Sequence, residues 1–266
     1  MIRLSYRVPA LTMLVVALLR PAMAHASSVP RTLRYQFTSG QIITYRLTDD
    51  AFYQQTLAHK AQPAARAHST QMLGYQFGTV GADGTVRLTI HFYRTLALTT
   101  QGGKTTRSTP AVGDQHVDQE ANGQQVDPVT GYSGGYALYD FGIVPTHPLQ
   151  VGSTWTATIG NTVDILGGTI LCSNVLTALS GNIATIATHG TITGPSEATT
   201  PAGAFKGLAT ETLQGTWHFD AQHGRFLGER LTKVVTLTGT VLANNKVVPY
   251  QFDQREQLTM LATPGR

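Results

Sequence analysis

Apolar and polar residues alternate with a period of two through most of the chain, which predicts β-strands with one dry and one wet face. The longest example covers residues 210–239 and predicts a β-hairpin that turns at residues 220–224, where Asp220 and Gly224 suit a turn. A five-residue loop then predicts three cross-strand pairs: Glu211 with Lys233, Leu213 with Leu231, and Trp217 with Leu227.

A second hairpin is predicted over residues 73–98, because Asp83-Gly84 is a typical two-residue turn between alternating segments. This turn predicts three pairs: Phe77 with Ile90, Tyr75 with Phe92, and Leu73 with Arg94. Arg94 breaks its apolar row, and two interpretations remain open. Either the strand bends away from the core there, or Arg94 points into a partly wet cavity and contacts an anionic head group.

The remaining segments extend the same pattern. Strands are expected over residues 33–37 and 43–47, and again from residue 154 onward, with a last hairpin that turns at 243–245. Residues 51–67 fit helix and strand poorly but favour strand, and residues 194–206 read as a loop. Residues 131–144 are expected to form a short helix or lid. A strand is expected over residues 169–179, with a short helix over 165–176 as the alternative. Together these elements predict a mainly β fold, a strongly curved antiparallel sheet or unclosed barrel with one or two short helices.

Residues 1–26 resemble an export signal, since Arg3 and Arg7 precede a short apolar run that small residues follow. The run is too short to span a bilayer as a helix. We therefore expect a periplasmic or secreted protein in which residues 27–266 form a single domain. No cysteine lies near the cleavage site, so a lipoprotein is not expected. Similar Gly-turn segments near residues 39–45 and 151–155 suggest an internal duplication, with halves at 32–130 and 145–262.

Charge and composition exclude several functions. The chain has 19 basic and 15 acidic residues, and loss of residues 1–26 would leave 16 basic residues against 15 acidic ones, without a basic cluster for nucleic acid. Contact with a membrane is expected to be transient at most. Cys172 is the single cysteine, has apolar neighbours and is expected to be inert. The acidic residues near Asp118 match no metal-binding loop, so neither a metal nor a cofactor is predicted.

A serine hydrolase motif, G-x-S-x-G, occurs at residues 131–135. The motif works only where a buried strand delivers the serine into a sharp turn before a long helix. The residues before it are polar and include Pro128, and Pro145 follows closely. We interpret the motif as a chance match and expect no enzymatic activity.

The turn and aromatic motifs together resemble exported bacterial proteins of unknown function that are similar to the lipoprotein-carrier group. The resemblance rests on Leu33-Arg-Tyr-Gln-Phe-Thr-Ser-Gly-Gln41, Asp83-Gly84, Pro148-Leu-Gln-Val-Gly-Ser-Thr-Trp155 and Gly215-Thr-Trp-His-Phe-Asp220 with Gly224. It implies an unclosed antiparallel barrel over a hydrophobic hollow. It supplies no catalytic residues.

We therefore expect a protein that binds an apolar or amphipathic, lipid-like molecule in the concavity of a curved sheet. The candidate ligand contacts are Phe92, Arg94, Tyr136, Tyr139, Glu211, Trp217 and Lys233. The alternative is a cell-surface or assembly module that binds a protein partner through exposed sheet edges and takes no small ligand. The sequence gives no oligomeric state.

Overall fold

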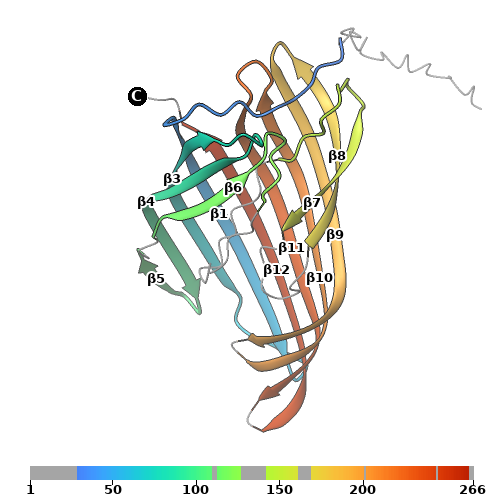
Figure 1. Ribbon diagram of the computed structural model, residues 1–266. Coiled ribbons are helices and arrows are strands. Elements are labelled where there is room, and N and C mark those ends of the chain that lie inside the picture. Colours follow the sequence, from blue (N-terminus) through green and yellow to red (C-terminus); the bar gives the residue numbers. More distant parts are fainter. Residues whose placement is uncertain are drawn as a thin grey trace, which may run out of the picture.

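The computed structural model describes residues 29–109, 113–126, 142–160, 169–200, 202–243 and 245–263 (Figure 1). These residues form an all-β structure, which confirms the predicted fold class. None of them lies in a helix, and this part of the chain accordingly has no helix able to cross a membrane. The strand predicted over residues 169–179 is confirmed, and the alternative helix over 165–176 is wrong from Thr169 onward, because Thr169–Ser180 is a strand.

Twelve strands form one antiparallel sheet that is not closed into a barrel. They are β1 Ile42–Leu57, β2 Lys60–Ala61, β3 Ala65–Val80, β4 Val86–Gln101, β5 Lys104–Ser108, β6 Gln115–Gln119, β7 Thr154–Gly160, β8 Thr169–Ser180, β9 Ile183–Thr200, β10 Gly203–Asp220, β11 Arg225–Ala243 and β12 Lys246–Ala262. The order is β5-β4-β3-β1-β12-β11-β10-β9-β8-β7, while β2 pairs with β1 and β6 with β4. The pairing of β1 with β12 joins the two ends of the described chain within the sheet.

Two segments differ from the predicted strand pattern. Residues 33–37 are not a strand and cross one end of the sheet, although Leu33 and Tyr35 are buried there. Residues 194–206 were predicted as a loop, but 194–200 belong to the end of β9 and 203–206 to the start of β10. The segment is rich in Gly, Pro, Ser and Thr, which gives it the composition of a loop although it continues the strands.

Both hairpin registers were predicted two residues out. In the main hairpin the observed partners are Glu211 with Val235, Leu213 with Lys233, and Trp217 with Glu229. Asp220 pairs with Arg225 around a four-residue turn, and Leu227 is an extra residue in a bulge next to it. The turn and the bulge each shift the register by one residue. Sequence alternation fixes which face a side chain takes, but not its partner.

The second hairpin contains the bend that was expected at Arg94. Tyr75 pairs with Ile90, and Phe77 with Leu88. Tyr93 is the extra residue of a bulge, so Arg94 lies opposite Met72 and its side chain is exposed. The structure thus supports the first of the two interpretations of Arg94, in which the strand leaves its apolar row.

Glycines allow the sheet to coil sharply near the start of β10, the end of β11 and the start of β12. Gly207 and Gly239 face each other across β10 and β11, and a Cβ on either would collide with the backbone of the neighbouring strand. Tyr250 follows in the same row on β12, opposite Gly239. The Phe205 and Tyr250 rings approach to 5.8 Å between centroids across this glycine pair. The close approach of strands here requires residues without side chains.

One face of the sheet is buried, and we call it the inner face. Near the end crossed by residues 29–38 it forms the capped cluster, in which sheet residues such as Tyr45, Trp217 and Phe219 pack beneath Leu33 and Leu149. At the opposite end lies the tip cluster, whose buried members all belong to strands: Phe205, Ala209, Val235, Leu237, Val241 and Tyr250. The capped cluster therefore has a covering layer of chain that the tip cluster lacks among the described residues.

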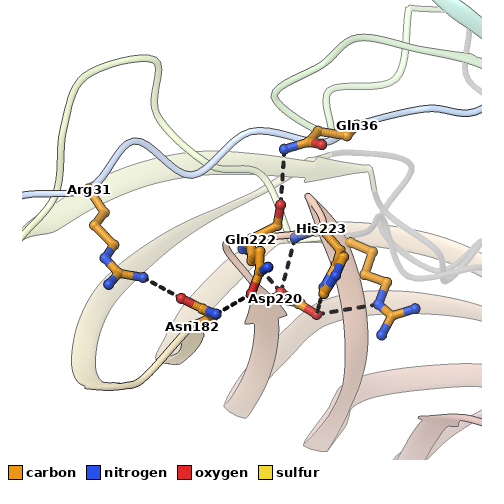
Figure 2. Close-up of polar contacts among 7 residues, drawn as sticks. Arg31, Gln36, Asn182, Asp220, Gln222 and His223 are labelled. Atoms are coloured by element: carbon orange, nitrogen blue, oxygen red, sulfur yellow. Dashed lines mark hydrogen bonds and ion pairs between the residues drawn. The ribbon is translucent and has the colours of Figure 1, made fainter.

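Polar contacts fasten the covering chain to two hairpin turns (Figure 2). Arg31 donates to Asn182 Oδ1 at 2.8 Å, Asn182 bonds the Gln222 side chain, and Gln36 donates to the Gln222 carbonyl at 3.3 Å. Below them, the Asp220 carboxylate accepts the backbone N–H groups of Gln222 and His223, each at 3.0 Å. These bonds select the four-residue turn and hold the cap in place.

Candidate functional site

A row of polar side chains crosses the inner face between the two apolar clusters. We call it the polar belt, and its members are Gln71 and Ser69 on β3, Asp49 on β1, Glu256 on β12, Lys233 on β11 and Glu211 on β10. Ser69 lies opposite Asp49, and Lys233 lies opposite Glu256. All six residues are at most 7% exposed. The belt is therefore a buried polar layer shared by five neighbouring strands.

An ion pair forms the centre of the belt. Lys233 Nζ lies 2.7 Å from Glu256 Oε2, and both side chains are buried. The same carboxylate oxygen accepts a hydrogen bond of 3.1 Å from Gln254 Nε2. Because buried ions need close partners, this pair explains how one lysine and one glutamate are tolerated here.

Asp49 shares this site and behaves as a weak acid. Burial, together with the negative charge of Glu256, raises the pKa of Asp49 from its usual 3.8 to about 7, while Lys233 opposes the shift. A hydrogen bond with Glu256 favours the protonated form of Asp49. The two carboxyl groups therefore share a proton in the neutral pH range.

Glu211 adds a third carboxyl group at the β10 end. Burial raises its pKa, the positive charge of Lys233 lowers it, and Glu256 raises it further. Glu211 lies opposite Val235 and therefore diagonally from Lys233, whose closest carboxylate partner is Glu256. Lys233 is the only buried basic residue in the described part of the chain. The belt thus holds more acid than base.

The β3 end of the belt contains polar atoms without partners. Asp49 Oδ1, Ser69 Oγ and both the oxygen and the nitrogen of the Gln71 amide are buried and make no hydrogen bond within the structure. Buried polar groups in proteins are nearly always hydrogen-bonded, and an unmet group costs roughly 1–3 kcal/mol. These four atoms lie on two adjacent strands, β1 and β3, at this end of the belt.

Only two of the candidate ligand contacts predicted from the sequence lie in the polar belt. Glu211 and Lys233 belong to the belt, but as diagonal neighbours, not as the cross-strand pair predicted. Trp217 is buried in the capped cluster, and Phe92 packs partly buried against it. Arg94 is exposed and does not point toward the inner face. Tyr136 and Tyr139 lie outside the described residues, as does the G-x-S-x-G segment.

Sequence reasoning missed Asp49, Ser69, Gln71 and Glu256. A signal was present, because Asp49 occupies an inward position in a strand whose other inward residues include Tyr45, Leu47 and Ala51. The strand predicted from the sequence ended at residue 47, so Asp49 fell outside it. A polar residue in an otherwise apolar row is better read as a feature of the inner face.

Metal binding and thiol chemistry receive little support from these side chains. No group of three or more His, Cys, Asp or Glu residues in the described segments has the geometry to hold a metal ion. The Asp118 carboxylate, which seemed crowded in the sequence, accepts two hydrogen bonds of 2.9 Å from Arg87. Burial raises the pKa of the Cys172 thiol, which makes it a poor nucleophile at neutral pH.

The fold and the belt define an open, strongly curved antiparallel sheet with a polar layer inside an apolar face. No protein-family profile and no curated protein sequence matches this chain. Among solved structures, lipovitellin, studied for its lipid–protein interactions, is similar with a TM-score of 0.45 and 11% identity over 87% of this chain. This chain spans about a quarter of lipovitellin, 26% of its length.

Two further solved structures show weaker similarity. OccK5 (OpdH) of Pseudomonas aeruginosa gives a TM-score of 0.26 at 5% identity, over 85% of this chain and 99% of that one. An outer membrane channel of Pseudomonas putida F1 gives 0.24 at 10% identity, over 86% and 97%. These values reflect shared antiparallel sheet structure and carry no information about function.

Proposed function

We propose that this protein is exported, has no enzymatic activity, and binds an apolar or amphipathic, lipid-like molecule along the inner face of its sheet. The polar end of the ligand contacts the belt, and its apolar part lies against the neighbouring clusters. The observation that carries this proposal is the group of unpartnered buried atoms on Asp49, Ser69 and Gln71.

The position of the belt supports an amphipathic ligand over a purely polar one. Val235 and Leu237 of the tip cluster follow Lys233 along β11, while Leu231 precedes it. A polar group at the belt is thus flanked by apolar side chains on both sides. Burial of an alkyl chain against such side chains contributes about 0.8 kcal/mol per methylene group. The alkyl chain of the ligand therefore supplies affinity, and the belt orients its polar end.

The leader-like segment supports export. Residues 1–26 combine early arginines, an apolar run and small residues, as in secretory signals. In the periplasm or outside the cell, a carrier or sensor of amphipathic molecules meets lipids released from membranes. Removal of the segment during secretion is expected, and N-terminal sequencing of the exported protein identifies the cleavage site.

Extraction of the purified protein tests this proposal. The protein is exported from its native host, purified without detergent, extracted with organic solvent and analysed by mass spectrometry. We expect one class of amphipathic molecule at close to one molecule per chain. A ligand-free protein whose tryptophan fluorescence does not respond to dodecan-1-ol, laurate or dodecylamine contradicts the proposal, because Trp217 lies on the same inner face.

The open sheet supports a second candidate function, recruitment of a partner strand. β5 and β7 end the sheet and do not pair with each other. Residues of β5 are exposed throughout, so its free edge is accessible. A partner protein would add a strand at such an edge. Replacement of Thr106 by Pro would then abolish partner capture and leave ligand extraction unchanged, which separates the two functions.

A further inference from the structure

The balance of charge in the polar belt identifies the kind of head group that the inner face accepts. Asp49, Glu211 and Glu256 supply three carboxyl groups, whereas Lys233 supplies one ammonium group. Lys233 is already engaged with Glu256 at 2.7 Å. Glu229, one further carboxyl group on the inward row of β11, is also buried. Among these buried groups, four carboxyl groups therefore stand against one ammonium group.

We propose that the belt binds a cationic amine on an apolar chain, so that the preferred ligand is an amphiphile with an ammonium head group. This inference rests on the proposed function and specifies its ligand. An ammonium group next to Asp49 and Glu211 favours the ionised forms of their carboxyl groups, and the resulting carboxylates neutralise its charge. The unpartnered oxygens of Asp49, Ser69 and Gln71 supply the acceptors that its N–H groups need.

Hydrogen-bond chemistry distinguishes this head group from the alternatives. An ammonium group has three donors and no acceptor. The β3 end of the belt offers three unpartnered oxygens, together with one unpartnered nitrogen, the Gln71 amide Nε2, which an ammonium group leaves unmet. A carboxylate or phosphate would bring only acceptors and a second negative charge next to Asp49 and Glu256. A hydroxyl group would satisfy some of the atoms but would leave the charge excess unbalanced.

The position of Glu211 strengthens the argument. Its side chain is 2% exposed, and no hydrogen bond to it is found among the described residues. Lys233 acts electrostatically on Glu211 and lowers its pKa, but the close contact of Lys233, at 2.7 Å, is with Glu256. A buried carboxylate in this situation attracts a positively charged ligand group because the surroundings screen charge poorly.

A panel of four probes tests the preference: dodecylamine, dodecan-1-ol, laurate and n-butylamine, titrated below their micelle concentrations and followed by calorimetry. We expect dodecylamine to bind about tenfold more tightly than dodecan-1-ol, since hydrogen bonds to charged groups are stronger than neutral ones. Laurate should bind least tightly of the C12 probes. The short n-butylamine, which has the cation without the chain, should bind too weakly to detect.

Matched variants locate the effect. Glu211→Gln should reduce the preference for dodecylamine over dodecan-1-ol to within about threefold, as expected when a charge-assisted bond is lost. Glu197→Gln is the control, because Glu197 is exposed and paired with Lys206 at 2.8 Å outside the inner face. Asp49→Asn is a second test if Glu211→Gln does not fold, and it should also weaken the binding of dodecylamine.

The outcomes separate this inference from the proposed function. Laurate binding as tightly as dodecylamine, or a preference unchanged by both belt substitutions, overturns the cationic head group and leaves amphiphile binding standing. Binding of n-butylamine as tight as that of dodecylamine shows that the site takes a cation without a chain, which also overturns the inference. No binding by any of the C12 probes overturns both proposals.

Discussion

The capped cluster and the polar belt are buried to similar degrees, but they differ in the hydrogen bonding of their buried polar atoms. In the capped cluster, Tyr45 donates to the Phe226 carbonyl at 3.0 Å, Tyr35 to the Gly142 carbonyl at 3.0 Å, and Trp155 to the Ile143 carbonyl at 2.8 Å. In the belt, atoms of Gln71 and Ser69 have no partner. The first region has the properties of a core, and the second is where we propose that the ligand binds. Single unpartnered atoms occur elsewhere, as on Gln119 and Thr188, but the belt holds four of them on two adjacent strands.

The largest expected effect lies in the capped cluster. Phe219 is fully buried and packs edge-on against Tyr35 at 5.0 Å between ring centroids. Phe219→Ala should lower the free energy of unfolding by about 3–5 kcal/mol, because it leaves a cavity beneath the cap. Urea unfolding measures the loss. A loss below that of the belt variants would show that this cluster is not the main source of stability.

The ion pair of the belt gives the next largest effect. Lys233→Met should destabilise the protein by about 3 kcal/mol, since Glu256 would remain buried without its cation. The double variant Lys233→Met/Glu256→Leu should recover most of this loss, because well-packed apolar residues often replace a buried pair without cost. A double variant as unstable as the single one would indicate that the pair itself stabilises the fold.

Asp49 makes stability depend on pH. Its folded pKa of about 7 exceeds the usual 3.8, so the folded state retains a proton that the unfolded state loses. The contribution of Asp49 to stability is therefore largest at low pH and falls as pH rises, by about 2–3 kcal/mol between pH 5 and 8, most of it below pH 7. Asp49→Asn should flatten this dependence in urea unfolding, whereas Asp83→Asn should not, because Asp83 is exposed and its hydrogen bonds with Thr85 lower its pKa. An unchanged slope in Asp49→Asn would contradict the raised pKa.

The two smallest expected effects on stability have opposite signs in the polar belt and in the capped cluster. Gln71→Leu removes unpartnered polar atoms and should stabilise the ligand-free protein by up to about 1 kcal/mol, whereas Tyr45→Phe removes a satisfied bond and should cost about 1 kcal/mol. Thermal unfolding compares them, with Gln214→Leu on the exposed face of β10 as control. Destabilisation by Gln71→Leu in the absence of ligand would indicate that the amide is already satisfied.

The fold was largely predictable because alternation specifies strands and faces. The strands around Tyr45, Tyr75, Trp217 and Leu231 were predicted with the correct inward side. The registers were not, since they depend on the four-residue turn held by Asp220 and on bulges whose energies are not visible in a hydrophobic pattern.

The site was predictable only in part, for a related reason. Glu211 and Lys233 stood out as charges within apolar rows. Asp49 and Glu256, by contrast, come from strands distant in sequence, and only the pairing of β1 with β12 brings them together. A belt assembled across five strands requires the complete strand order, which periodicity alone does not supply.

Photo-crosslinking tests most directly the claim that the belt receives the polar end of an amphiphile. The probe is dodecylamine with a diazirine on the carbon next to the amine, and labelled peptides are identified by mass spectrometry. We predict saturable labelling of peptides containing Asp49, Gln71 or Glu256, reduced in Gln71→Leu and unchanged in Gln214→Leu. Labelling confined to exposed apolar residues such as Leu242 and Val247, and insensitive to Gln71→Leu, would contradict the account.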